Sequence, residues 1–221
     1  MKTAERELAR ALRREHGIPV RRLAEMVGVS RSSISLWVRD IELTPAQVAA
    51  LRRAAVAGAA KNAARARARR RGFQFEGRAH ARAGDLLHVA GCMLFWAEGS
   101  RTRNSVQFTN SDPGMVAFFL RFLRECYQVP NDRVRVACNL FADHISRQHE
   151  IEQHWLDVLG LPRTALTKSM VNKYSKHSQK KRRNKLPYGT CRLTVYDTRL
   201  VQQIYGAIQE YAGVDREEWV L

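Results

Sequence analysis

The chain has 221 residues, of which 45% are hydrophobic and 27% charged, a balance that is typical of a folded protein and excludes wholesale disorder. Lys and Arg number 38 against 21 Asp and Glu, so the formal net charge is +17. A neutral small-molecule enzyme has no need of such a charge. It indicates a polyanionic partner, either nucleic acid or an anionic membrane surface.

The sequence contains no signal for several classes of protein function. The longest apolar run, residues 86–97, is shorter than the ~20 residues of a membrane span, so no membrane partner is expected. The N-terminal residues lack an apolar signal core, which predicts a cytoplasmic, nucleoid-associated protein. No phosphate-binding loop, nucleophile elbow or dinucleotide fingerprint occurs, so no small-molecule substrate is evident. The four cysteines are widely spaced and are expected to be small core residues: Cys92, Cys126, Cys138 and Cys191.

Composition divides the chain into three zones and predicts an α+β fold. Residues 1–44 carry apolar residues at helical spacing, and residues 45–83 are rich in Ala and Arg. Residues 84–221 hold nearly all the aromatic residues and the only strand-like alternation. We expect an all-α DNA-binding domain (1–44), a long basic linker helix (45–83) and a mixed α/β domain with an antiparallel sheet (84–221).

Residues 20–40 show two short helical patterns separated by a glycine. Gly28 fits a left-handed turn and Ser30 an N-cap, while the apolar positions of both helices fall on facing stripes: Leu23, Ala24, Val27, Ile34, Trp37 and Val38. The pattern closely resembles the helix-turn-helix of bacterial DNA-binding regulators and recombinases. A generic helical hairpin is the alternative.

This resemblance implies that residues 30–41 form a recognition helix that enters the DNA major groove. Arginine can bind guanine by two hydrogen bonds, and serine can bind a base or a phosphate. The residues expected to contact DNA are Ser30, Arg31, Ser32, Ser35 and Arg39 on this helix, with Arg21 and Arg22 before the turn on phosphates.

The Ala/Arg-rich zone is predicted to be one helix. Thr44 can cap it, with Pro45 at the first position and Gln47 completing a capping box, and Gly72 is expected to end it. Two interpretations stay open for its many arginines. They either solubilise an exposed linker or contact DNA phosphates.

Period-two alternation in the last zone predicts strands at residues 105–110, 133–141, 169–174 and 190–196, with helices at 113–127, 145–159 and 198–211. One strand face is apolar, and the other is polar and basic without acids, as expected for a sheet that contacts DNA. A basic loop follows within residues 163–185 and either binds phosphates or solubilises the chain. The expected DNA contacts of this zone are Arg103, Arg133, Arg135, Lys173, Lys180, Lys181, Arg182, Arg183 and Arg192.

A small-residue helix at 90–97 ends in Glu98-Gly99-Ser100, and here the sequence resembles the LAGLIDADG homing endonucleases over residues 85–212. The resemblance implies an αββαββα fold with its sheet in the DNA major groove, and a homodimer because the motif occurs once. It also implies that Glu98 is a catalytic metal ligand for Mg²⁺, with Gln107, Asn110 or Lys168 positioning water. The alternative is that Glu98 pairs with Arg101 or Arg103 and only closes the helix.

Two functions follow from these observations. The first is a sequence-specific, double-stranded DNA-binding protein that regulates transcription, and the second is a Mg²⁺-dependent DNA endonuclease. Fold alone does not decide between them.

Overall fold

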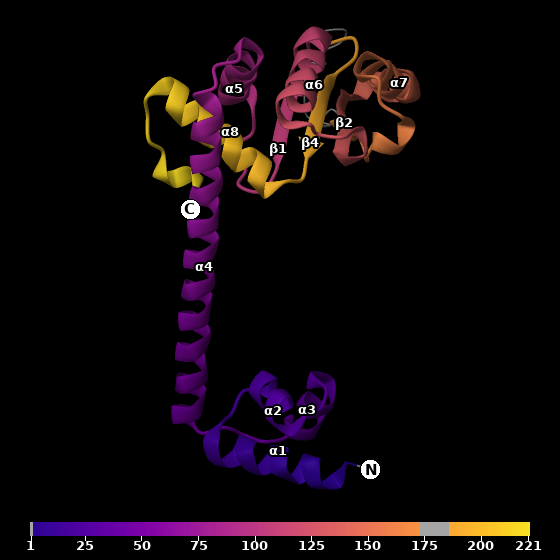
Figure 1. Cartoon of the computed structure of the whole chain (residues 1–221). Coiled ribbons are helices and arrows are strands. Elements are labelled where there is room, and N and C mark those ends of the chain that lie inside the picture. Colours follow the sequence, from indigo (N-terminus) through magenta and orange to yellow (C-terminus); the bar gives the residue numbers. More distant parts are fainter. Residues whose placement is uncertain (1, 173–185) are drawn as a thin grey trace, which may run out of the picture. The chain divides into compact units, whose positions relative to one another are not determined.

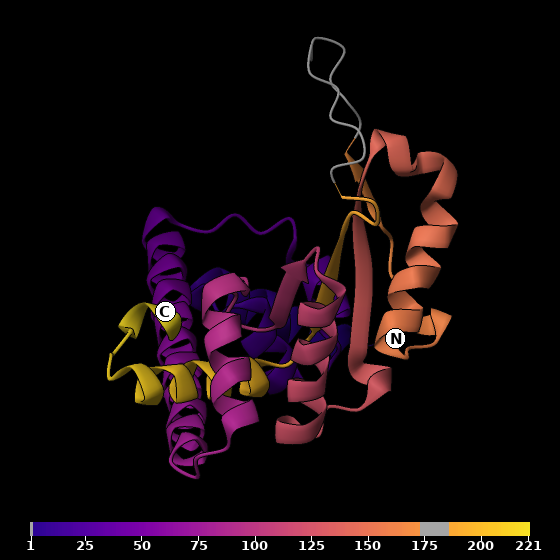
Figure 2. The same ribbon diagram turned by 90° about the horizontal axis from the view of Figure 1, so that it is seen from above.

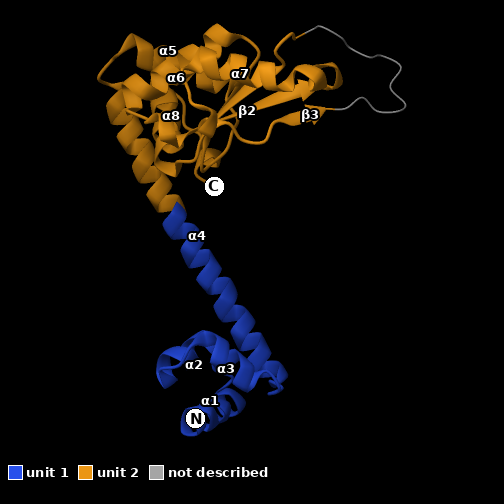
Figure 3. Cartoon of the chain, turned by 90° about the vertical axis from the view of Figure 1, so that its right-hand side faces the viewer, with its two compact units in different colours: residues 1–66 blue, residues 67–221 orange. Residues whose placement is uncertain are grey.

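The computed structural model describes residues 2–172 and 186–221. The chain forms two compact units, Met1–Ala66 and Arg67–Leu221, which are coloured separately in Figure 3. The boundary lies inside one long helix, α4 (Pro45–Ala81), so this helix belongs to both units.

Unit 1 contains three short helices and the first part of α4 (Figure 1). The helices are α1 (Thr3–His16), α2 (Val20–Val27) and α3 (Arg31–Val38). Their buried core consists of Ala9, Leu23, Ile34 and Val38, with Trp37 packed beside it. The sequence therefore predicts the apolar stripes of α2 and α3 correctly, but it assigns no helix to the residues of α1.

Helix α4 begins at Pro45 as predicted and ends at Ala81, close to the end of the expected helical zone (45–83) and beyond the candidate stop at Gly72. The backbone N–H of Thr44 donates to Gln47 Oε1 at 2.9 Å, and the N–H of Gln47 donates to Thr44 Oγ1 at 3.3 Å, which is a capping box. Gly72 does not end the helix, which continues to Ala81. The left-handed glycine lies further on, at Gly84 (φ 68°). A single interior glycine weakens a helix by only ~1 kcal/mol, which tertiary packing readily offsets.

Unit 2 is built on a four-stranded sheet. Its strands are β1 (Val106–Asn110), β2 (Val134–Phe141), β3 (Met170–Asn172) and β4 (Thr190–Val195), in the spatial order β1-β4-β2-β3. The β1–β4 and β2–β4 pairs are antiparallel, as expected, but β3 lies parallel to β2. The sheet is thus mixed and not wholly antiparallel, because helix α7 (Gln148–Leu159) connects β2 to β3 and returns the chain to the same end of the sheet.

Three helices pack against the sheet, and a fourth packs beside them (Figures 1 and 2). Helices α5 (Leu86–Glu98), α6 (Pro113–Tyr127) and α7 contact the strands, whereas α8 (Thr198–Ala212) packs on α5. Short 3₁₀ turns lie at Asn131–Arg133, Ala142–Arg147, Arg163–Ala165 and Glu217–Trp219. The helix predicted at residues 145–159 starts later than expected. Its first residues belong to the 3₁₀ turn Ala142–Arg147, and α7 starts at Gln148.

The element order of unit 2 differs from the αββαββα order that the LAGLIDADG resemblance implies. One named strand, not two, follows α5, and the order is αβαβαββα. The segment between α5 and β1 pairs with β1 only through the Gly99–Phe108 bridge and the bond from Ser100 N–H to Gln107 O (2.9 Å). The chain then turns between Thr102 and Ser105, which leaves too few residues for a second strand.

The last third of α4 is part of the core of unit 2 rather than a linker. A Cβ atom on Gly77 of α4 would lie 1.9 Å from Gln203 O of α8, and a Cβ on Gly206 of α8 would lie 2.0 Å from Gln74 O. The two helices therefore cross backbone to backbone at paired glycines. Gln74 spans the crossing, since its side chain bonds to Gln202 Oε1 (2.7 Å) and accepts from Gln209 Nε2 (3.1 Å).

The cysteines are free thiols, and three of the four are buried, as predicted for core residues. Cys138 and Cys191 are register partners on neighbouring strands. Burial raises the pKa of the Cys138 thiol to about 11, so it stays protonated at neutral pH. Within residues 2–172 and 186–221, none of the helices is long and apolar enough to cross a membrane.

Candidate nucleic-acid interface

The turn between α2 and α3 has the geometry that the sequence predicts. Gly28 ends α2 in the left-handed conformation (φ 68°), where a side chain would strain the backbone. Ser30 then caps α3, and its Oγ accepts from the N–H of Ser33 at 3.3 Å. The buried Leu23 of α2 and Ile34 of α3 lie in the same core cluster and hold the two helices together.

The outward face of α3 presents the side chains expected to bind DNA. Arg31, Ser32, Ser35 and Arg39 are all exposed. In the described part of the chain, the guanidinium groups of Arg31 and Arg39 make no hydrogen bond or ion pair. The same face exposes Leu36 (58%), which the sequence interpretation omits. An exposed leucine here can contact the methyl group of thymine. Leu36 lies outside the apolar stripe of Ile34, Trp37 and Val38, and this position in the sequence could have revealed its exposure.

Arg21 and Arg22, the predicted phosphate contacts of α2, share an acidic neighbour. Arg21 Nε lies 3.1 Å from Glu25 Oε1, and Arg22 Nη1 lies 3.4 Å from Glu25 Oε2. Arg21 above all lowers the pKa of the Glu25 carboxyl. All three side chains are exposed, so these pairs are weak and a phosphate can displace Glu25.

Other arginines of unit 1 position α3 instead of facing solvent. Arg10 of α1 binds Asp40 through two hydrogen bonds (2.7 and 2.8 Å) and also donates to Trp37 O. This guanidinium holds the pKa of Asp40 well below its usual value. Arg13 donates to Ile18 O at 2.8 Å in the turn before α2. The sequence gives no sign of these roles, because each partner lies in a different helix or turn.

In unit 2, the polar side of the sheet is the second surface predicted to bind DNA. The strand register aligns Gln107, Thr194 and Arg135 in one row, and Thr109, Arg192 and Ala137 in the next. No acidic residue belongs to the four described strands. Arg192 lies on the inner strand β4, beside the small Ala137, and forms no hydrogen bond or ion pair with the described residues. It is the best-placed arginine of this surface.

The other predicted arginines of unit 2 are bound to the protein itself. Arg133 pairs with Asp197 (3.1 Å), and Arg135 donates to Asp132 O (2.7 Å) and Val134 O (2.9 Å). Arg103 donates to Leu221 O. Phosphate would have to compete with these partners.

The predicted catalytic residues are not gathered at one place. Glu98 is the last, exposed residue of α5 and, contrary to the alternative in which it closes the helix, pairs with neither Arg101 nor Arg103. Ser100 bonds to the backbone of Gln107, so Gln107 lies near the end of α5, and Asn110 ends the same strand. Lys168 precedes β3 at the opposite edge of the sheet, three strand spacings or about 14 Å away.

A Mg²⁺ site is not built by the described residues of one chain. They contain no group of three or more His, Cys, Asp or Glu side chains that could hold a metal ion. Glu98 contributes one carboxylate, and Mg²⁺ is commonly held by one or two carboxylates with waters and substrate phosphates, so its binding at Glu98 stays a prediction.

The basic residues of α4 fall into two classes that the sequence does not separate. From Arg70 onward, arginines are bound to the C-terminal region: Arg70 to Val220 O, Arg71 to Glu217, Arg78 to Glu210 and Asp215, and Arg82, just past the helix, to Glu210. Further toward the N-terminus, the side chains without such a partner among the described residues are Arg52, Arg53, Lys61, Arg65, Arg67 and Arg69.

Part of the predicted basic loop cannot be compared with the structure. Lys173, Lys180, Lys181, Arg182 and Arg183 lie outside the described residues. Their contact with phosphate stays a prediction.

Comparison with known proteins agrees with the geometry of unit 1. A helix-turn-helix family model matches residues 10–54, which run from α1 into the start of α4. The comparisons with curated proteins and with solved structures give no match. The family model does not reach the region that resembles LAGLIDADG endonucleases. Residues 10–54 form a helix-turn-helix domain, the kind of domain that binds double-stranded DNA.

Proposed function

We propose that this protein is a sequence-specific, double-stranded DNA-binding protein that regulates transcription. The exposed face of α3 carries the proposal. It sets unpaired Arg31 and Arg39 beside exposed serines on the second helix of a helix-turn-helix. Such a helix reads base edges in the major groove, and arginine pairs with guanine through two hydrogen bonds.

The ion pairs of unit 1 are consistent with insertion of α3 into the major groove of DNA. Arg10 holds the end of α3 to α1 through Asp40 and Trp37, so the helix keeps a fixed orientation. Glu25 forms only weak, exposed pairs with Arg21 and Arg22, so both arginines remain available to phosphates. Fixed side chains lose less conformational entropy when DNA binds.

The test is selection of a binding site from random duplex DNA with the whole chain, followed by substitution of one arginine. Arg31→Ala should relax the preference at one base pair and weaken binding of the selected site by about 1–3 kcal/mol. Arg14→Ala is the matched control, because Arg14 is also exposed in unit 1 but lies on α1. The control should leave the selected sequence unchanged. If Arg31→Ala retains both the selected sequence and the affinity, the docking of α3 is wrong.

The polar sheet face and a homodimer are further parts of the proposal. Arg192 is free to contact a phosphate, and replacing it with Gln should weaken all sequences alike. One side of α5 exposes Leu86 (87%), Ala90 and Ala97, which are spaced to form a helical stripe that a second copy could cover. Sedimentation equilibrium of the whole chain would reveal the dimer, and Leu86→Glu should shift it toward monomer.

The endonuclease alternative has a separate test. A library of duplex DNA is incubated with the protein and Mg²⁺ or Mn²⁺. The regulator proposal expects tight binding without cleavage. Metal-dependent cutting that Glu98→Gln abolishes, with binding in EDTA retained, would favour the endonuclease instead.

A further inference from the structure

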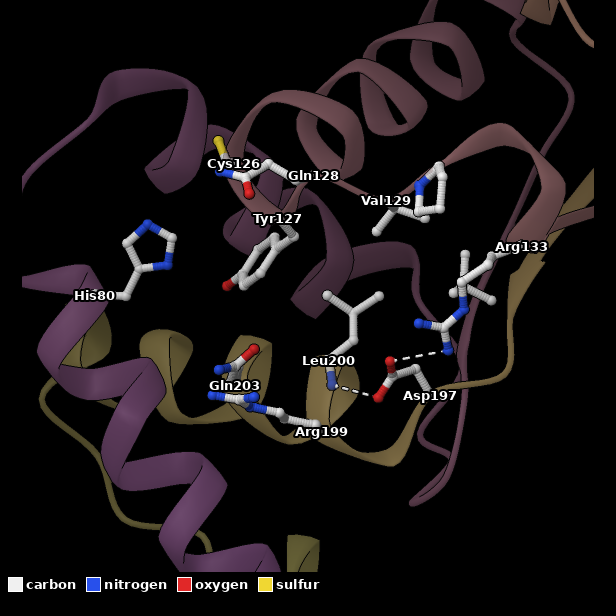
Figure 4. Close-up of a pocket in the computed structure, with 12 residues that line it drawn as sticks. His80, Cys126, Tyr127, Gln128, Val129, Arg133, Asp197, Arg199, Leu200 and Gln203 are labelled. Atoms are coloured by element: carbon white, nitrogen blue, oxygen red, sulfur yellow. Dashed lines mark hydrogen bonds and ion pairs between the residues drawn. The ribbon is translucent and has the colours of Figure 1, made fainter.

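Unit 2 contains a pocket of about 410 Å³ that the DNA-binding proposal does not use (Figure 4). It lies where the last turn of α4, the C-terminal end of α6, the 3₁₀ turn before β2, the end of β4 and the first turns of α8 meet. Small-molecule sites in proteins have volumes of roughly 300–1,000 Å³. The pocket therefore has room for a metabolite-sized molecule.

Each of the two arginines at this pocket binds an acidic residue through one guanidinium nitrogen and leaves other guanidinium N–H groups without a partner among the described residues. Arg133 uses Nη2 for Asp197, and Arg199 uses Nε for Glu76 at 3.0 Å and lies over the ring of Phe73. The Nη1 of Arg133 and both Nη groups of Arg199 make no hydrogen bond with the described residues. Both guanidinium groups thus retain N–H donors in fixed places.

The acid of the pocket has no oxygen left without a partner. Asp197 Oδ1 accepts from the backbone N–H of Leu200 (3.0 Å) as the N-cap of α8, and Oδ2 faces Arg133. Both bonds are drawn in Figure 4. Gln203 donates its Nε2 to Glu76 Oε2 at 2.9 Å, and Arg199 binds the same oxygen. Donors therefore prevail among the groups still open to a ligand, so the pocket suits an acceptor-rich molecule.

The opposite wall is rigid and aromatic. The ring of the exposed His80 lies against that of buried His88, with the centroids 4.2 Å apart and the planes tilted by 36°. His88 is itself fixed through both ring nitrogens, by Tyr211 Oη at 2.6 Å and Tyr127 Oη at 2.8 Å. Figure 4 shows His80 and Tyr127 on one side of the pocket and the Arg133–Asp197 pair at the other end. The imidazole of His80 and the ring of Tyr127 are thereby held in place as a ligand-facing surface.

Gln128 adds an unusual backbone at the rim. It ends α6 with φ 53°, and no other non-glycine residue of the described chain has a positive φ. Glycine fits this conformation best, and another residue there costs of order 1 kcal/mol. The side-chain amide of Gln128 is exposed and forms no hydrogen bond with the described residues. The left-handed residue caps the end of α6, as is common at helix C-termini, and it places the Gln128 side chain at the rim of the pocket.

We propose that this pocket binds a small organic anion, with carboxylate or phosphate oxygens on the guanidinium group of Arg199, which Figure 4 shows on the Gln203 side of the pocket, and its remainder against His80, Tyr127 and Gln128. Arg133, at the other end of the pocket, is a second donor for a ligand long enough to reach it. The proposal does not depend on the helix-turn-helix, since all these residues belong to unit 2, and Arg133 is the one residue that it shares with the predicted DNA contacts. It gives a candidate regulator a place to sense a metabolite.

The experiment is isothermal titration of the whole chain, without DNA, in about 150 mM KCl, where charges in solvent more than a Debye length apart are screened. Three probes separate the sources of the anion: inorganic phosphate, citrate and AMP. The expected result is one-to-one binding of at least one probe with a Kd below about 1 mM. Binding of citrate alone assigns a carboxylate ligand, and binding of phosphate or AMP assigns a phosphate ligand.

Three variants distinguish a built site from the general attraction of a basic protein. Arg199→Gln should weaken the bound probe at least about 10-fold, as expected for a lost charged hydrogen bond. Arg121→Gln is the matched control, because Arg121 is equally exposed (58% against 61%) on α6 but does not line the pocket. Gln128→Gly removes the amide while keeping the left-handed backbone, so it should weaken binding about three-fold or more without lowering Tm.

Two results would overturn the proposal. One is the absence of binding by all three probes up to 10 mM. The other is equal weakening by Arg199→Gln and Arg121→Gln, which would show that net charge alone attracts the anion. Circular dichroism of each variant checks that the fold is retained.

Discussion

Two successive parts of α4 are both basic but lie in opposite environments. Residues 52–66 carry three Arg and one Lys, and residues 67–81 carry five Arg. The first stretch has almost every side chain in solvent, whereas the second buries Gln74, Gly77 and Ala81 against unit 2. Two of its arginines pair with acids that come more than 120 residues later, Arg71 with Glu217 and Arg78 with Glu210. The sequence thus gives the number of positive charges in a basic run. Only the acidic residues that pack against the run in the folded chain determine which of its arginines remain available to DNA.

The strongest expected effect concerns the available charges. With α3, the sheet and the first part of α4 offering free arginines, about six or more phosphates should be neutralised on duplex DNA. The association constant should then fall about 10³-fold or more between 50 and 200 mM salt, with a log–log slope of about −0.9 per phosphate. Fluorescence anisotropy with labelled duplex DNA measures this slope. An affinity that does not change over this range would show that the free arginines do not bind phosphate.

The second prediction compares two glycines of α4 that face different environments. Gly77→Ala should lower the free energy of unfolding by about 3 kcal/mol, because the new Cβ would overlap the backbone carbonyl of Gln203 and helix α8 would have to shift. Gly72→Ala is the control, since a Cβ there meets no atom within 4 Å. It should stabilise the protein by about 0.5–1 kcal/mol. Urea unfolding measures both, and equal effects would mean that the α4–α8 crossing is not close.

The third prediction uses the histidine on which the end of α4 rests. Burial, helped by neighbouring His80, lowers the pKa of His88 from 6.5 to about 4. The unfolded chain therefore binds more protons between these values, so stability is complete above pH 6.5 and falls as the pH drops toward 4. The loss should be about 2 kcal/mol by pH 4.5.

The variant His88→Gln should remove this part of the pH dependence, because it cannot take up the proton. Its control is His149→Gln, an exposed histidine of unit 2. Urea unfolding at pH 7 and pH 4.5 gives the difference for each protein. A wild-type pH profile identical to that of His88→Gln would contradict the role assigned to His88.

The smallest expected effect concerns whether an ion pair with an acidic residue keeps an arginine of the α4 region from binding DNA. Arg65→Gln removes a free charge of α4 and should reduce the salt slope of DNA binding by about 0.9. Arg82→Gln removes an arginine that binds Glu210 at 2.7 Å and should leave the slope nearly unchanged. Equal reductions would show that these exposed ion pairs do not withhold arginines from DNA.

Local patterns in the sequence were sufficient to predict most of the elements and one of the sites. The glycine and serine between α2 and α3 act on their own backbone, and so does the capping box of Thr44 and Gln47, which is why both were predictable. Helix α6 has the predicted limits, since Asp112 caps it and Pro113 opens it. Alternation likewise predicted the polar and apolar faces of β1, β2 and β4.

The tertiary structure decided the features that depend on distant partners. Gly72 resembles a helix stop, yet α4 continues because α8 packs on the next turns at Gly77. Lys168 and Gln107 appear in one predicted catalytic set, but the strand order separates them across the sheet. Arg133 pairs with Asp197 at the pocket, a partner that the sequence does not indicate, and its contact with DNA stays a prediction.

The sequence by itself determined the charge, the helix-turn-helix and the positions of most helices and strands, because these depend on the backbone preferences and periodicity of neighbouring residues. Only the tertiary structure decided which arginines are free, that β3 runs parallel to β2, and that a pocket forms between α4, α6 and α8. These properties arise from contacts between residues far apart in the chain, such as Gln74 with Gln202 and Arg199 with Glu76. Composition and periodicity do not predict such contacts, because many different pairs of distant residues are compatible with the same local pattern.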